Sequence, residues 1–177
     1  MNEILANLDV AGLVPGDWAV RWSVRLALIG YFVGAAIEAN RTASSAAQRV
    51  ARAAWTWGCA WYLVHVACAF HFYHGWSHAA ALRHTAERTA LTTGLYWDGG
   101  LWINYALTLA WLIDVGWWWL APSSRARRPR SVSIGWHAFL WFIVFNATAV
   151  FGDGSVRWLG GVGCACLALM ALVLRPH

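Results

Sequence analysis

The chain has 177 residues, of which 60% are hydrophobic and only 12% are charged. Soluble domains carry about 25% charged residues, so this composition excludes an ordinary soluble domain and indicates one integral membrane domain over residues 1–177. The net charge is +5, but the basic residues lie beside apolar runs, where they meet lipid headgroups, so we expect no nucleic-acid partner.

Five apolar stretches are long enough to cross a bilayer core, which takes about 20 helical residues. In chain order they cover residues 19–39, 53–75, 99–121, 132–151 and 156–174. The first is the weakest, because Arg21 and Arg25 lie in its first two turns. The sequence therefore predicts an all-α fold, a polytopic membrane helical bundle with five transmembrane helices, or four if the first stretch does not cross.

The longest connection lies between the second and third stretches. Ser77 is a suitable N-cap and Gly94 a suitable C-cap, which predicts a short extracytoplasmic helix over residues 78–93. The chain is also rich in tryptophan, and many of its 15 tryptophans lie near the ends of the apolar stretches, as in an interfacial belt. Gly30 and Gly34 form a small-x3-small pair in the first stretch, a pattern typical of close helix packing.

Arginines alternate between the connections, which predicts the orientation of the bundle. The arginine-rich segments contain Arg41, Arg49, Arg52, Arg125, Arg127, Arg128, Arg130 and Arg175. The intervening connections carry fewer arginines, balanced by acids. We expect an integral membrane protein, in a bacterial inner membrane, with its N-terminus extracytoplasmic and its C-terminus cytoplasmic. Its expected partners are the lipid bilayer and other membrane subunits or a second copy of itself.

Four histidines fall within 14 positions at the outer end of the second stretch. On a helix, the first three of them share one face within about 60°. Two acids follow nearby, one of them a single turn beyond the fourth histidine. Imidazoles and carboxylates suit zinc, copper or non-haem iron, so the sequence predicts a metal site. The candidate ligands are His71, His74, His78, His84, Glu87 and Asp98.

The alternative for these histidines is that they are interfacial residues, since an imidazole is amphipathic in the same way as tryptophan. A proton-transfer role also remains open. The geometry disfavours bis-histidine haem, because His65 and His137 differ in depth by roughly a helical turn. We therefore do not expect haem as a cofactor.

A second polar pair lies inside the predicted membrane region. Asp114 in the third stretch costs several kcal/mol there unless it is paired or protonated, by order of magnitude. His137 in the fourth stretch lies at a similar depth, so we expect an intramembrane Asp114–His137 hydrogen bond. The pair is either a structural link between helices or a proton-relay element.

These observations favour three functions. The first is a metal or redox protein with its site at the outer interface, serving oxidation or electron transfer. The second is a non-catalytic accessory subunit of a larger membrane complex. The third is a small proton- or metal-coupled transporter. Whether the chain is an enzyme stays open, because it has no phosphate-binding loop, nucleophile elbow or zinc-protease box.

Overall fold

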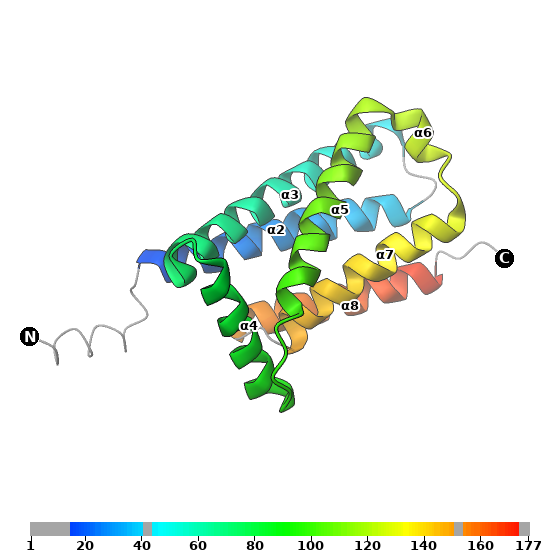
Figure 1. Cartoon of the computed structure of the whole chain (residues 1–177). Coiled ribbons are helices and arrows are strands. Elements are labelled where there is room, and N and C mark those ends of the chain that lie inside the picture. The colour runs from blue at the N-terminus through cyan, green and yellow to red at the C-terminus, as the bar shows by residue number, and fades with distance from the viewer. Residues whose placement is uncertain (1–14, 41–43, 151–153, 174–177) are drawn as a thin grey trace, which may run out of the picture.

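The computed structural model describes residues 15–40, 44–150 and 154–173, and all regular secondary structure in these ranges is helical (Figure 1). The helices are α2 (Pro15–Ala39), α3 (Ser45–His74), α4 (His78–Thr93), α5 (Gly100–Leu120), α6 (Pro122–Ala126), α7 (Arg130–Phe145), the π-helical turn η1 (Asn146–Val150) and α8 (Gly154–Val173). The fold is all-α. Arg41, Arg175, residue 151 and the end of the fifth predicted stretch at 174 lie outside the described residues.

Local sequence signals set the helix ends around α3 and α4. The hydroxyl of Ser44 accepts a hydrogen bond from the Ala47 amide at the start of α3. Ser77 caps α4 in the same way. Both helices end at glycines in the left-handed conformation, Gly75 at φ 53° and Gly94 at φ 77°. Glycine adopts this backbone at little steric cost, which is why the chain turns there.

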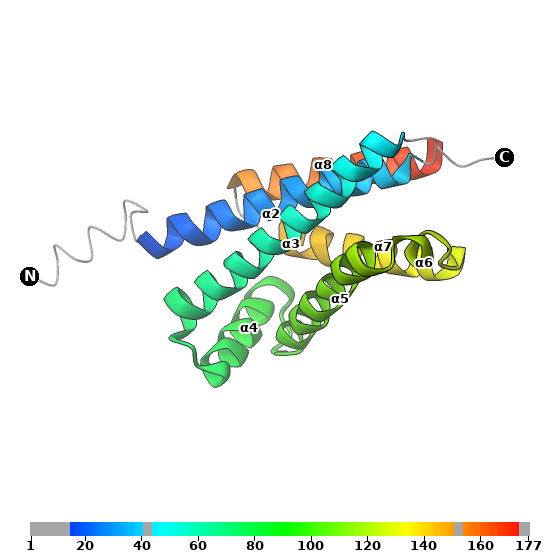
Figure 2. The same cartoon turned by 90° about the horizontal axis from the view of Figure 1, so that it is seen from above.

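Helices α2 and α3 pack against each other along most of their length, and α2 lies between α3 and α8 (Figure 2). Glycines allow the close crossing. A Cβ on Gly30 would lie 2.6 Å from the Gly58 backbone, and a Cβ on Gly34 would lie 3.0 Å from the Trp55 ring. The small-x3-small pair of the sequence therefore faces α3, and it allows the two backbones to approach closely.

An aromatic cluster connects α2, α3 and α5 in the buried core. The ring of Trp55 lies 5.8 Å from Tyr31 and 5.4 Å from Trp111, between ring centroids. Tyr62 stacks on Trp111 at 5.7 Å. Aromatic pairs at such distances add about 0.5–1.5 kcal/mol each beyond the area they bury. The cluster fixes the middle of the bundle and separates its two ends.

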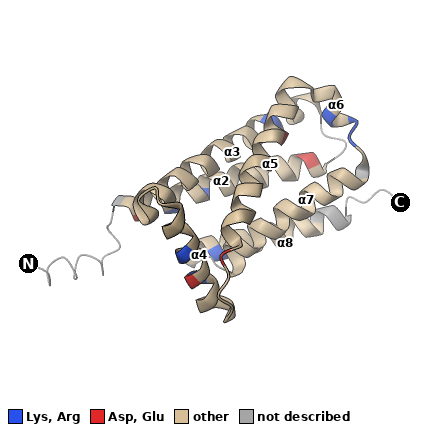
Figure 3. Cartoon of the chain, viewed as in Figure 1, with Lys and Arg blue, Asp and Glu red and all other residues tan. Residues whose placement is uncertain are grey.

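Two described helical segments are long and apolar enough to cross a membrane, Gly16–Ala39 and Ser131–Val150, and Gly154–Leu169 is a shorter apolar helix. The prediction of five spans is therefore supported only at the level of an all-α helical bundle. Helices α3 and α5 are not among the segments that meet this criterion. Arg49, Arg52 and several histidines lie in α3, and Asp114 lies in α5. Figure 3 shows long stretches of α5, α7 and α8 without charged residues.

Candidate functional site

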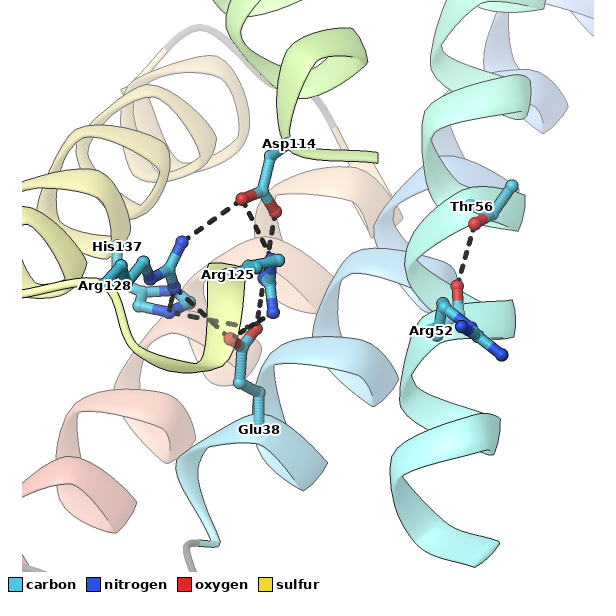
Figure 4. A network of polar contacts seen from close by, with 7 residues as sticks. All are labelled: Glu38, Arg52, Thr56, Asp114, Arg125, Arg128 and His137. Atoms are coloured by element: carbon cyan, nitrogen blue, oxygen red, sulfur yellow. Dashed lines mark hydrogen bonds and ion pairs between the residues drawn. The ribbon is translucent and has the colours of Figure 1, made fainter. Parts of the chain in front are cut away.

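Polar and charged side chains from five segments meet at the end of the bundle where α5 gives way to α6 and α7 (Figure 4). They come from α2, α5, α6 and α7 and from the turn before α7. The members of this ionic network are Glu38, Asp114, Arg125, Arg128 and His137.

Arg125 is the centre of the ionic network. Its Nε and Nη2 donate to the two carboxylate oxygens of Asp114 at 3.1 and 2.9 Å, a bidentate pair. Its Nη1 lies 3.0 Å from Glu38 Oε1. The guanidinium also stacks on Trp118, with its carbon 3.7 Å from the ring centroid. Asp114 is 4% exposed and Arg125 6% exposed, so this pair is shielded from water.

The charges in the ionic network balance, because two arginines face two carboxylates. Burial lowers the pKa of the Arg125 guanidinium, but hydrogen bonds from Asp114 and the charge and hydrogen bond of Glu38 outweigh burial and raise the pKa above its ordinary value. Arg125 therefore stays charged. Such a balanced, hydrogen-bonded set satisfies ions that would each be costly to bury alone.

The two residues that the sequence paired, Asp114 and His137, both belong to the ionic network, and the link between them runs through Arg128. Its Nη1 lies 3.2 Å from Asp114 Oδ1, and its Nη2 lies 3.2 Å from His137 Nε2. Asp114 and His137 are thus linked by this arginine bridge and not by the direct hydrogen bond that we expected. The physical reason is that an arginine fork satisfies a carboxylate better than one imidazole does.

Glu38, Arg125 and Arg128 were not predicted as site residues from the sequence. A signal was present, because Glu38 is an acid at the end of an apolar stretch and the connection at 125–130 is rich in arginine. The positive-inside rule treats such arginines as orienting charges only. In the structure, the side chains of Arg125 and Arg128 instead turn inward onto carboxylates.

At the opposite end of the bundle, α3 and α4 meet at a tight corner. Gly75 and Trp76 follow each other in the left-handed conformation, and the φ of Trp76 is 60°. A bulky side chain rarely adopts this backbone, so the corner is strained. Trp76 is held there by its indole N–H, which donates to His71 Nδ1 at 3.3 Å, and by its contact with the Phe70 ring.

The four clustered histidines have different neighbours around this corner. His71 accepts the hydrogen bond from Trp76. The rings of His74 and His84 lie 5.2 Å apart between centroids. His78 Nδ1 lies 3.0 Å from the Tyr105 hydroxyl. His74 Nδ1 is buried without a hydrogen-bond partner among the described residues.

No group of three or more His, Cys, Asp or Glu side chains that could hold a metal ion occurs within residues 15–40, 44–150 and 154–173. Glu87 and Asp98 are exposed. The structure therefore brings together His74 and His84 of the six candidate ligands. The shared face of His71, His74 and His78 does not produce a common site, because α3 ends at His74 and His78 belongs to the next helix.

A cavity of about 230 Å³ lies between the α3–α4 corner and the aromatic cluster. Its walls come from α2, α3, α5, α7 and η1, with Thr85 from α4, and they are mainly apolar. The polar side chains that line it include Tyr62, His65, His74, Asn104, Tyr105 and Thr108. Tyr31 and Trp111 of the aromatic cluster line the cavity, and Trp55 of the same cluster lies 6.4 Å from His137 of the ionic network, between ring centroids.

The hydrogen bonds of the polar lining fix its orientation. The hydroxyl of Thr108 donates to the Tyr62 hydroxyl at 3.3 Å or to the Asn104 carbonyl at 2.8 Å. His65 Nδ1 lies 3.0 Å from the Val20 carbonyl, which can only accept, so Nδ1 carries the hydrogen. Nε2 of neutral His65 is then an acceptor.

The π-helical turn η1 forms another part of the wall. Ala147 and Thr148 of this turn line the cavity. The Thr148 hydroxyl donates to the Val144 carbonyl at 2.7 Å. Single π turns inside α-helices occur frequently at functional sites, because they displace side chains from the regular helical register. The cavity is therefore bordered by η1, the π-helical segment that continues α7.

Comparison of the chain with protein-family models, with curated proteins and with solved structures finds no match in any of the three.

Proposed function

We propose that this chain is an integral membrane protein that binds a small, mainly apolar molecule in the cavity between α2, α3, α5 and α7. The observation that supports this function best is the cavity itself. Its apolar walls carry a few fixed polar groups, which is the usual composition of a small-molecule site. At about 230 Å³ it has room for a molecule of the size of one or two aromatic rings.

The membrane part of the proposal rests on the outer surface of the helices. Large apolar side chains are exposed on every long helix, among them Ile29, Val64, Leu109, Ile113, Ile134, Phe142 and Val162. Several polar residues of α3 and α5, such as His65 and Thr108, line the cavity instead. These two helices can therefore face lipid although neither contains a stretch that meets the apolar criterion met by α2. On this basis all five long helices cross the bilayer.

The test of the proposed function is binding of 1-naphthol, an aromatic ring with one hydroxyl, to the full chain in lipid nanodiscs. Equilibrium dialysis against empty nanodiscs removes the contribution of lipid. Ala69→Phe fills the cavity, because Ala69 lines it. Ala67→Phe adds the same side chain at an exposed position of the same helix. We expect saturable binding that Ala69→Phe abolishes and Ala67→Phe retains. Equal binding by both variants would contradict the proposal.

A second candidate function is that of an accessory subunit of a larger membrane assembly. It is favoured by an apolar patch around the α4–α5 connection, where Leu91, Leu95, Tyr96, Trp97 and Trp102 are all exposed. Native electrophoresis of gently solubilised membranes tests this function. Migration of the chain at its own mass, with no higher band, would rule it out.

A further inference from the structure

We infer that His74 and His84 form a two-histidine site for a transition-metal ion such as Zn²⁺ or Co²⁺ at the corner between α3 and α4. The inference goes beyond the proposed function and does not depend on it. Imidazole is a good ligand for this class of ion. The six-residue site expected from the sequence is thereby reduced to the two residues that the fold brings together.

The separation of the two rings fits a shared ion. Their centroids lie 5.2 Å apart and their planes are inclined by 63°. Two imidazoles that bind one tetrahedral zinc through bonds of about 2.0 Å have centroids about 5 Å apart. The two rings are therefore already at the spacing that shared coordination requires.

The corner holds the two histidines at this spacing. His74 is the last residue of α3, and His84 lies in the second turn of α4. The backbone between the helices is fixed by Gly75, by the cap of Ser77 and by a hydrogen bond from the Trp76 amide to the Phe70 carbonyl at 2.9 Å. A site whose ligands are prearranged loses less conformational freedom when the ion binds.

Hydrogen bonding at the corner distinguishes His74 from the neighbouring histidines His71 and His78. Within the described residues, His74 Nδ1 has no partner, although it is buried. His71 and His78 are instead engaged with Trp76 and Tyr105. Two of the four positions around a tetrahedral ion would come from the protein. Water, or a molecule in the cavity that His74 lines, would supply the others.

The experiment is Co²⁺ titration of the tag-free full chain in nanodiscs, followed by the visible absorption bands of tetrahedral cobalt and by zinc competition. His74→Gln and His84→Gln remove one ligand each, and the double variant removes both. We expect one equivalent of Co²⁺ in the unchanged chain, a loss of affinity of about tenfold or more in each single variant, and little further loss in the double variant. His71→Gln and His78→Gln are the matched controls and should retain binding.

A second measurement guards against variants that fold poorly. Zinc should raise the melting temperature of the unchanged chain and of His71→Gln, but not of His74→Gln or His84→Gln. The metal-free melting temperatures give the effect of each substitution on folding alone. Absence of saturable Co²⁺ binding in the unchanged chain would overturn the inference, and so would equal weakening by His71→Gln and His74→Gln. Binding of 1-naphthol in the absence of metal would remain in either case, so the two proposals fail separately.

Discussion

The guanidinium of Arg128 lies between Asp114 and His137, 3.2 Å from a carboxylate oxygen of the first and 3.2 Å from Nε2 of the second. Arg128 precedes α7, whereas Asp114 lies in the last turns of α5. The bridge therefore ties the end of one long helix to the beginning of the next. Glu38 joins it from α2, 3.3 Å from Arg128 Nη2.

Removing the Asp114 carboxylate should destabilise the protein strongly. Asp114→Ala leaves the buried guanidinium of Arg125 without its bidentate partner, and breaking a buried ion pair from one side costs about 3–5 kcal/mol. Asp114→Asn should cost less, because the amide oxygen still accepts a hydrogen bond. Unfolding in mixed micelles, followed by circular dichroism, measures the difference. Glu87→Ala, an exposed acid on α4, is the control. A free energy of unfolding equal for Asp114→Ala and Glu87→Ala would show that the network does not stabilise the fold.

Glu38 and Arg128 should be energetically coupled. In a double-mutant cycle with Glu38→Gln and Arg128→Gln, we expect a coupling energy of about 1–3 kcal/mol, because both side chains are shielded and share further partners. The reference cycle uses Asp17 and Arg21, whose side chains are 26% and 64% exposed at 3.4 Å, where about 0.5 kcal/mol is typical. Coupling in the first cycle no larger than in the reference cycle would refute the shielded network.

The ends of α4 and the end of α5 follow from local sequence signals, whereas α3 begins at Ser45 although the second predicted stretch begins at residue 53. Ser77, Gly94 and Pro122 act on the backbone within one turn, so the residues themselves specify where α4 begins and ends and where α5 stops. The close α2–α3 crossing is indicated by Gly30 and Gly34, but the sequence did not indicate that Gly30 would meet Gly58 of α3. Small residues mark a surface that permits close approach, but the register of two helices depends on both surfaces together.

The candidate site could be predicted only in part, because its contacts join residues far apart in the chain. A helical projection places His71, His74 and His78 on one face only if the helix continues through all three. The left-handed pair Gly75 and Trp76 ends it after the second. Nothing in a single sequence specified that a tryptophan would adopt this backbone. Likewise, Arg128 could reach Asp114 only through the fold of the connection before α7.

An alanine at Gly30 should destabilise the α2–α3 pair. The added Cβ would lie 2.6 Å from the Gly58 backbone and 2.7 Å from the Ala54 carbonyl oxygen, where no flexible side chain can move aside. Overpacking of this kind costs about 1–3 kcal/mol. Gly116→Ala is the matched variant, since nothing lies within 4 Å of its Cβ. It should stabilise α5 by about 0.5–1 kcal/mol. Opposite signs of the two changes in unfolding free energy are the expected result.

If α5 crosses the membrane, Glu87 on α4 and Arg127 after α6 lie on opposite sides of the bilayer. Both positions are exposed, so a cysteine at either can react with a maleimide. The experiment starts from a chain in which Cys59, Cys68, Cys164 and Cys166 are replaced by serine. From the arginine distribution, an impermeant maleimide added to intact cells should label Glu87→Cys, and Arg127→Cys only after permeabilisation. The predicted orientation counts Arg125 and Arg128, which form ion pairs with Asp114 and Glu38. Labelling of Arg127→Cys but not of Glu87→Cys in intact cells would show that these two arginines do not orient the chain. Labelling of both cysteines from outside would mean that α5 does not cross the membrane at all.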